Sequence, residues 1–380
     1  MIWPFCPVPQ FNESLIWNTI ILSPFDSESR QSLGDSPRTI YSLPFAMSFR
    51  QYERAKLIVE LNGTAPWSLP SWESRQRFSA AASATSISID TTISDYRAGS
   101  YAILWKSDET YERVLIDTVN PSSLTLDAPT VNAYANGYCM PERTAYLLNG
   151  LEATRTVQPI VSASTEWGCY DGIDLSSSPY PTYRSHPIIT DCPRIGSNSL
   201  SDRIEWPNEM VDSSLGVPYF DTTRGRINRQ TGMGWIAKNR SELWSVNRFL
   251  HACKGRRKGF WHADWTRGIE LVSTIASGST SVTIKAIGLN VAAESGDLLI
   301  KKKSGTTHYL QYTAVAPSGS NEVLTLAGTA GFSCSPSDIG TFSRMRFMRF
   351  DHDRFEINHQ HTGSGQVSTI MAQMVETPLP

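Results

Sequence analysis

The order of sequence elements occurs twice along this chain. In the first half, residues 50–61 (RQYERAKLIVEL) have the apolar spacing of an amphipathic helix that ends at Asn62-Gly63, and the aromatic segment 67–72 follows. In the second half, residues 239–253 predict a helix capped by Asn239 or Ser241, and the aromatic segment 260–265 follows Lys254-Gly255. A repeat of this length constrains the whole architecture, so we expect two copies of one structural unit.

Short strands continue the repeat after each aromatic segment. They alternate apolar and polar residues, as half-buried strands do, and turns separate them at intervals of about ten residues. Such spacing is typical of a small sandwich or barrel. The matching segments are 86–89 with 280–284, 99–104 with 296–300, 114–116 with 309–312, and 124–126 with 324–326. We therefore predict two inserted β modules, at 78–145 and 268–345.

The predicted fold class is mainly β with two short-to-medium helices (α+β). It consists of an internally duplicated β-rich body with a small β-sandwich or barrel inserted in each half. The strands that return from the modules to the bodies are predicted at 146–161, 345–357 and 367–375. The first body comprises 1–77 and 146–167, and the second comprises 209–267 and 346–380. Between them, the turn-rich bridge 168–208 is predicted to be either an extended ordered arm or a mobile linker.

Composition excludes several classes of protein. The 34 Lys and Arg residues against 36 Asp and Glu give a net charge of −2, which provides no overall positive field for a nucleic acid. With 18% charged and 10% aromatic residues, the chain has the composition of a folded protein. The N-terminus lacks a basic region before an apolar one, and the apolar stretch 15–22 is too short to span a bilayer. We expect neither a secretory signal nor a membrane segment.

The cysteines give no sign of a metal or redox motif. No C-x-x-C pair occurs, so buried thiols in a reducing cytosol are the simplest expectation. Whether Cys169 and Cys192 pair after release from the cell stays open. The six residues are Cys6, Cys139, Cys169, Cys192, Cys253 and Cys334.

Motifs of the common enzymes are missing from the sequence. It contains no G-x-S-x-G, H-E-x-x-H, P-loop or G-x-G-x-x-G pattern, and its histidines stand mostly alone in polar segments. We therefore predict no enzyme activity, no catalytic or cofactor-binding residues, and no cofactor.

One cluster could hold a metal ion. Asp351, His352 and Asp353 lie close in sequence to His359 and His361, and residues i and i+2 of a strand point to the same side. Charged residues on a strand near a sheet edge also prevent edge-to-edge association, and this second interpretation is favoured. No metal site is predicted, and metal binding by these residues remains a question.

Two basic runs were weighed as binding sites. The run 254–258 lies beside Phe260, Trp261 and Trp265, a mixture that can bind single strands or acidic partners, although a solvated loop at a helix C-terminus is the favoured interpretation. The run 301–303 predicts an exposed hairpin tip.

The aromatic residues could form a saccharide-binding surface, as in adhesins. However, Trp67 and Trp72 recur as Phe260 and Trp265 at equivalent places in the two halves. Such equivalence favours packing in the core or at an interface of a repeated unit.

The chain opens with an aromatic-rich start, a strand, an acidic-polar turn and a Pro-Arg strand. These and later segments carry a resemblance to a known family, namely 13–22, 26–33, 37–39, 65–72, 183–188 and 255–261. They resemble tail-tip proteins of long-tailed, non-contractile bacteriophages. The segment 255–261 also resembles distal tail proteins of gene transfer agents.

The resemblance implies a virion structural protein located where the tail tube meets the tip complex. It implies a homo-hexameric ring through which the genome passes without sequence-specific binding, with the tail tube protein, the tip hub proteins and tail fibres as partners. The implied location is the virion tail tip, after assembly in the host cytoplasm. The alternatives are a receptor- or carbohydrate-binding tail adhesin, for which the inserted modules would be the binding parts, and a tail-associated cell-wall hydrolase.

Overall fold

Strands make up most of the molecule. The computed structural model describes residues 1–22, 28–155, 159–190, 201–206, 208–212, 214, 216–222, 227–292, 295–362 and 365–379. Strands account for 54% of the chain and helices for 11%, which confirms the predicted mainly β fold class. The two predicted helices are present as α1 (Phe49–Asn62) and α2 (Arg240–Cys253), and a single helical turn, α3 (Leu289–Ala292), accompanies them.

Local capping explains where the two main helices begin and end. Ser48 caps α1 through a reciprocal capping box with Gln51, and Asn239 caps α2 by accepting a hydrogen bond from the backbone of Glu242. Gly63 ends α1 and Lys254 ends α2, both at positive φ, where the backbone N–H still bonds to the last turn.

The first body is an antiparallel sheet with the order β1–β4–β12–β11–β5, and α1 lies between β4 and β5 in the chain. A separate hairpin, β2–β3, leaves the sheet between β1 and β4. The elements are β1 (Gln10–Ile16), β2 (Thr19–Leu22), β3 (Ser29–Ser32), β4 (Arg38–Ser48), β5 (Trp67–Pro70), the short helix η1 (Trp72–Ser74), β11 (Tyr134–Arg155) and β12 (Ile160–Cys169).

The second body repeats this pattern with the order β15–β18–β26–β24–β19. It also has a hairpin, β16–β17, between its first two strands, and two strands that both pair with β26, β24 and β25, take the place of the single long strand β11. The elements are β15 (Ser201–Glu205), β16 (Asn208–Val211), β17 (Tyr219–Thr222), β18 (Asn228–Ala237), β19 (Phe260–Ala263), β24 (Ile339–Phe350), β25 (Arg354–Thr362) and β26 (Gly365–Glu376).

Each body carries a β module between its helix-strand unit and its returning strand. In the first, β6 and β8 pair with the N-terminal part of β11, and β9, β10 and β7 continue the pairing from β8. In the second, β20–β23 lead into β24 through the short helix η2. The elements are β6 (Gln76–Ala80), β7 (Ser86–Ser88), β8 (Tyr101–Ser107), β9 (Thr110–Asn120), β10 (Ser123–Leu126), β20 (Ser281–Lys285), β21 (Gly296–Lys302), β22 (Thr307–Ser318), β23 (Asn321–Leu326) and η2 (Pro336–Asp338).

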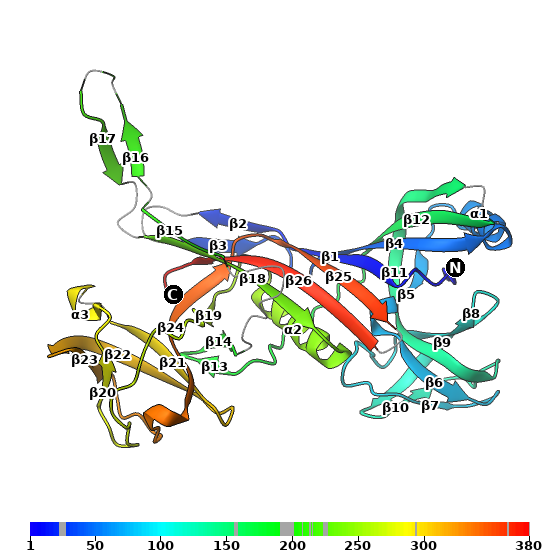
Figure 1. Cartoon of the computed structure of the whole chain (residues 1–380). Helices are drawn as coiled ribbons and strands as arrows, with labels where there is room; N and C mark the ends of the chain where they lie inside the picture. Colours follow the sequence, from blue (N-terminus) through cyan, green and yellow to red (C-terminus); the bar gives the residue numbers. More distant parts are fainter. Residues whose placement is uncertain are drawn as a thin grey trace.

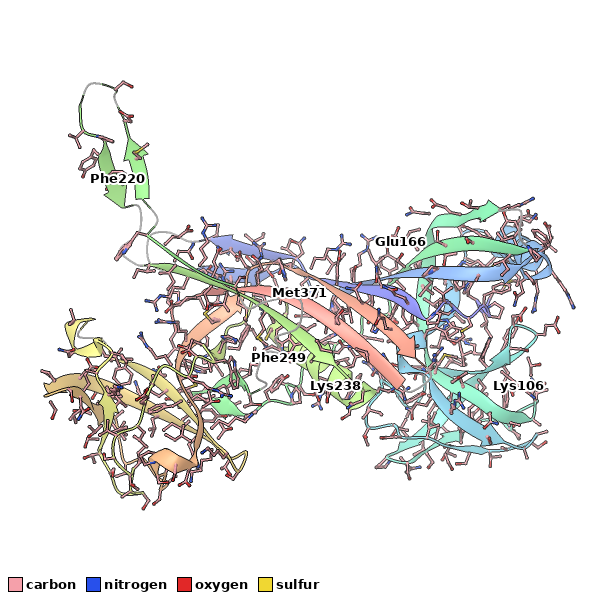
Figure 2. All side chains as sticks on the ribbon, viewed as in Figure 1. Lys106, Glu166, Phe220, Lys238, Phe249 and Met371 are labelled. Carbon is pink, nitrogen blue, oxygen red and sulfur yellow. The ribbon has the colours of Figure 1, made fainter. Side chains whose placement is uncertain are left out.

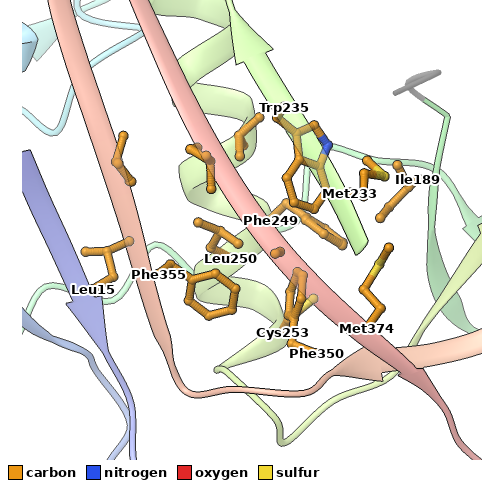
Figure 3. Packing of buried hydrophobic residues seen from close by; sticks show 14 of the residues in the cluster. Leu15, Ile189, Met233, Trp235, Phe249, Leu250, Cys253, Phe350, Phe355 and Met374 are labelled. Carbon is orange, nitrogen blue, oxygen red and sulfur yellow. The ribbon is translucent and has the colours of Figure 1, made fainter. Parts of the chain in front are cut away.

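Separate hydrophobic clusters occupy the modules and the bodies. One cluster draws all its buried residues from between Phe78 and Cys139, and another from between Ile269 and Phe342, so each module has a core of its own. In the second body, the apolar face of α2 packs beneath the sheet, where Phe249 contacts Phe260 and Phe350 edge-on (Figure 3).

The two bodies join through one pair of strands. β1 of the first body pairs antiparallel with β25 of the second over its whole length, from Gln10 opposite Gln360 to Ile16 opposite Arg354. The result is a continuous antiparallel sheet in the order β11–β12–β4–β1–β25–β26–β18–β15, which runs across the middle of the molecule (Figure 1).

The predicted bridge contains ordered strands that belong to the second body. β13 (Thr182–Tyr183) pairs with β14 (His186–Ile189), and β14 lies parallel to β19. Tyr180 packs edge-on against Phe249 of α2, and β15 at the far end of the bridge pairs with β18. The residues of the bridge up to 190 therefore form an arm along the second body, whereas 191–200, with Cys192, lie outside the described residues.

Candidate functional site

The most unusual chemistry of the molecule lies beneath the strand pair that joins the two bodies. Glu13 is an inward-facing residue of β1, between Phe11 and Leu15, and it is almost completely buried. His359 of β25 lies on the same side of the pair and places its Nε2 atom 3.0 Å from Oε2 of Glu13. The other ring nitrogen, Nδ1, lies 2.9 Å from the hydroxyl of Ser368 on β26. Both nitrogens of this buried imidazole are thus engaged.

A second carboxylate belongs to the same cluster. The hydroxyl oxygen of Tyr41 on β4 lies 3.1 Å from Oε1 of Glu13 and 3.1 Å from Oε1 of Glu73, the latter in η1. In β11, Nη1 of Arg143 lies 3.5 Å from the Tyr41 hydroxyl, and Nη2 donates to Asp171 at 2.8 Å. Because the hydroxyl has one proton and faces two acceptors, a proton on Glu73 would complete the set of hydrogen bonds.

Burial and the neighbouring charges separate the two carboxylates. Burial raises the pKa of Glu73 to about 7, and the negative charge of Glu13 adds to the effect. Burial also acts to raise the pKa of Glu13, but the hydrogen bond and charge of His359, together with Arg143, outweigh it and hold that pKa below its usual value. Near neutral pH, Glu13 is therefore the charged member of the pair, and Glu73 takes up a proton readily.

A small cavity lies beside this cluster, between the first body and α2. It measures about 40 Å³, which is room for one or two water molecules and too little for a substrate. Three buried polar atoms at the cavity find no hydrogen-bond partner among the described residues, namely Glu73 Oε2, Arg240 Nε and Asn247 Oδ1. Ordered water in the cavity would satisfy them. The arrangement is suited to holding the bodies together through polar contacts.

The β2–β3 hairpin adds a second contact between the bodies. Glu28, just before β3, accepts hydrogen bonds from Nε and Nη2 of Arg349 in β24 and from the Thr377 hydroxyl, all at 2.6–3.1 Å. Asp353 accepts from the backbone and hydroxyl of Thr19 at 2.8 and 3.0 Å, and from the backbone of Arg256 at 2.8 Å. The first body therefore places one strand and one hairpin on the second body.

The structure does not assemble the predicted acidic and histidine residues into a common site. Asp353 anchors Thr19 and Arg256, Asp351 lies 3.6 Å from Arg349, and the His352 ring lies edge-on to Phe355. His361 stacks on Phe11, and burial lowers its pKa to about 3, with the charge of Arg75 adding to the effect. Within the described residues, no group of three or more His, Cys, Asp or Glu side chains could hold a metal ion.

The basic runs mostly make contacts within the chain. Lys254 lies 3.1 Å from Asp174 and 3.5 Å from Asp35, and Arg256 donates to Asp353 and to the carbonyl of Thr19. In the second run, Lys302 donates to the carbonyl of Ser333, and Lys301 lies over the ring of Trp265. In the first run, Lys254, Arg256 and Arg257 thus lie against carboxylates of the same chain, whereas the contacts of Lys301 and Lys302 leave their charges in place.

The paired aromatic residues lie mainly inside the molecule. Trp67 and Trp72 are fully buried, as is Phe260, and Trp3 and Trp167 both pack edge-on against Trp67. Trp265 is only partly buried. A groove of about 680 Å³ lies between the bridge and α2, where Tyr180 and Trp235 line it.

The polar cluster at the junction was not foreseen from the sequence. Its members come from distant parts of the chain, so their spacing carries no motif; they are Glu13, Tyr41, Glu73, Arg143, Asp171, His359 and Ser368. One signal was available: Glu13 occupies an inward position of the alternating strand 10–16, where a charged side chain requires a partner.

Among the described residues, no helix has both the length and the apolar character needed to cross a membrane. Comparison of the sequence with protein-family models and with curated proteins finds no match.

Proposed function

We propose that this chain is a virion structural protein of a long non-contractile phage tail tip, specifically a distal tail protein whose copies form a ring that joins the tail tube to the tip complex. Its partners in this proposal are the tail tube protein, the tip hub proteins and tail fibres, and the genome passes through the ring without sequence-specific binding. The proposed stoichiometry is six chains.

The observation that carries the proposal is the pairing of β1 with β25. One β-rich body is joined to a second, similar body by a continuous sheet, and each body has the same strand order. Repetition of one unit through one kind of edge contact is how identical subunits build rings, because such heterologous contacts close when the rotation between units is suitable. The buried polar cluster fixes the relative position of the two bodies, as a mechanical role requires.

The small junction cavity also supports a structural role over the hydrolase alternative. Its carboxylates, Glu13 and Glu73, have pKa values shifted in opposite directions, yet the space beside them admits only water. A polysaccharide chain of a cell wall cannot reach them in this conformation.

Cryo-electron microscopy of intact particles tests the proposal. We expect density for this chain as a closed ring next to the tail tube, with sixfold symmetry. A ring of different symmetry at that place would contradict the stoichiometry alone. Location only at fibre ends, or absence from the particle, would contradict the proposed function.

A further inference from the structure

The two bodies differ at the outer edge of the first strand. β1 pairs with β4 on one side and with β25 on the other. Its counterpart in the second body, β15, pairs with β18, and no strand of the described chain pairs with its other edge. Residues 201–204 of this strand are exposed, and Ile204 is 66% exposed. An unpaired strand edge with an exposed apolar side chain is a template for another strand.

The matching edge lies at the opposite end of the sheet. The C-terminal part of β11, residues 151–155, pairs with β12 as β25 pairs with β26. On its other side, β25 receives β1, whereas no strand within the described residues pairs with 151–155. The chain thus has two complementary edges, and the internal junction shows how such edges combine.

The hairpins differ in the same way. β2–β3 of the first body is anchored on the second body through Glu28 and Thr19, as described above. The equivalent hairpin β16–β17 projects away from the rest of the molecule (Figures 1 and 2). Three of its apolar side chains are largely exposed: Val217 at 96%, Tyr219 at 67% and Phe220 at 58%. Exposed apolar residues gathered on one projecting element mark an interaction surface.

The helices show where this hairpin would bind. Seven side chains of α2 are buried, but only Ala55 of α1 is. Leu61 of α1 is 76% exposed. The residue of α2 at the same distance from its N-cap, Ala252, is buried and lines a pocket together with Glu28 and Arg30 of the first body. The C-terminal end of α1 is therefore an uncovered counterpart of the surface on which β2–β3 rests.

We propose that β15 and the β16–β17 hairpin of one chain bind to the β11 edge and the C-terminal end of α1 in a second copy of the chain. This contact would repeat between chains the junction that β1 and β2–β3 make within one chain. It deepens the proposed ring function and rests on it for the closure of the contacts into a ring.

The internal ladders define the register of the new pair. Ser201 lies opposite Gly232, which is seven residues before Asn239, the cap of α2. In the first body, Glu13 lies opposite Tyr41, which is seven residues before Ser48, the cap of α1. By this count Ser201 corresponds to Glu13. By the same count, Ile357 connects through Ile370 to Trp235, four residues before the cap of α2, and Glu152 connects through Ser164 to Pro44, four residues before the cap of α1. Trp235 is buried whereas Pro44 is not, so the alternation of the two bodies is offset by one residue relative to the helix caps. Since Glu13 lies opposite Ile357, Ser201 of one chain lies opposite Glu152 of the next or within about two residues of it, with both side chains exposed.

This register also brings opposite charges together. Arg203 lies two residues from Ser201 on the same face of the strand, so it would lie diagonal to Glu152 across the new pair. Both side chains are exposed, and the Arg203 guanidinium already lies 2.5 Å from the Glu205 carboxylate, so Glu152 would be a second acidic neighbour.

Cross-linking of the purified full-length chain tests the contact. In a Cys6→Ser/Cys192→Ser background, which removes the exposed thiol among the described residues and the thiol that lies close to β15 in sequence, the variant S201C/E152C is treated with a short bismaleimide. We expect a ladder of covalent multimers from the double variant. A mixture of the two single variants should give covalent dimers and nothing larger, because each chain then has one reactive edge. The single variants alone supply the background.

The hairpin provides an independent arm of the test. Y219S/F220S should weaken self-association by at least about tenfold in mass photometry, because it removes the exposed rings. Val291→Ser, which changes an 84% exposed apolar residue in the second module, should leave self-association unchanged.

The outcomes separate this contact from the proposed function. Failure of the chain to self-associate, or assemblies that form without linking residues 201 and 152, would overturn the contact even if particles contain the ring. Specific links in the purified protein combined with absence of the chain from particles would overturn the proposed function and leave the contact standing.

Discussion

His359 and Glu13 lie 346 residues apart in the chain and 3.0 Å apart in space, where the imidazole Nε2 atom meets the carboxylate beneath the strands that join the two bodies. Both side chains are almost fully buried, and Tyr41 holds the second carboxylate, Glu73, against the same group. The contact joins the first strand of the chain to one of its last, so its loss should affect the whole junction.

Replacement of Glu13 by alanine should destabilise the protein. It leaves His359 buried without its carboxylate, and removing one partner of a buried pair costs about 3–5 kcal/mol. Glu356→Gln is the matched control, because Glu356 lies on the same strand β25 with a side chain that is 62% exposed, and it should change stability by less than about 0.5 kcal/mol. Urea denaturation measures both; equal effects would contradict a structural role for the pair.

Glu73 should make the protein less stable as the pH rises. Its pKa is about 7 in the folded chain against 4.5 for the free side chain, so the folded state holds an extra proton between these values. Stability from this group is therefore present below pH 4.5 and is lost as the pH rises through 7. Glu73→Gln should remove that slope and gain on the order of 2–3 kcal/mol at pH 8. Melting curves of both proteins from pH 5 to pH 8 would contradict the prediction if they ran parallel.

Two glycines at the ends of the helices should differ sharply in their tolerance of alanine. At Gly255, with φ of +63°, a Cβ atom would collide with the Asp353 carboxylate and lie 3.1 Å from Cβ of Trp17. At Gly63, with φ of +55°, it would meet nothing within 4 Å. Gly63→Ala should cost about 1–2 kcal/mol from backbone strain alone. Gly255→Ala should cost about 1–3 kcal/mol more from overpacking, as chemical denaturation would show.

Leu61 offers a test of assembly that leaves the fold intact. Its 76% exposure means that Leu61→Asp should change the melting temperature of the free chain little, while it reduces self-association at least about tenfold. Val131→Asp, at an 80% exposed position in the first module, is the control and should affect neither property. If the Leu61 variant assembles normally, the conclusion is that α1 does not belong to the interface.

A chelator should leave the melting temperature of the protein unchanged. His359 uses one ring nitrogen for Glu13 and the other for Ser368, so metal binding by this residue would require breaking the junction. Elemental analysis before and after chelation checks the point, and a retained stoichiometric ion would contradict it.

Local patterns were sufficient to predict the helices and many strands. The caps of α1 and α2 lie within a few residues of the helices that they start, and the alternating strands carry their own period. The repeated order of elements also led to the mainly β architecture with two helices, because both copies contain the same local signals.

The contacts between the bodies could not be predicted in this way. The pairing of Gln10 with Gln360 joins segments from opposite ends of the chain, and the residue pattern of neither strand indicates with which strand it pairs. In the bridge, β14 contains Pro187 and lacks a clear alternation, because it pairs in parallel with β19 and buries Ile188 and Ile189 together. The candidate site depends on these distant pairings, so it became visible only in the fold.

Because β1 and β25 belong to one polypeptide, the joint that they make persists at any dilution. In a ring of such chains, contacts between the two bodies of one chain would alternate with contacts between neighbouring chains. Half of the contacts would therefore exist before two chains meet, so fewer collisions would be needed to close the ring. Disassembly would release chains in which the two bodies are still joined.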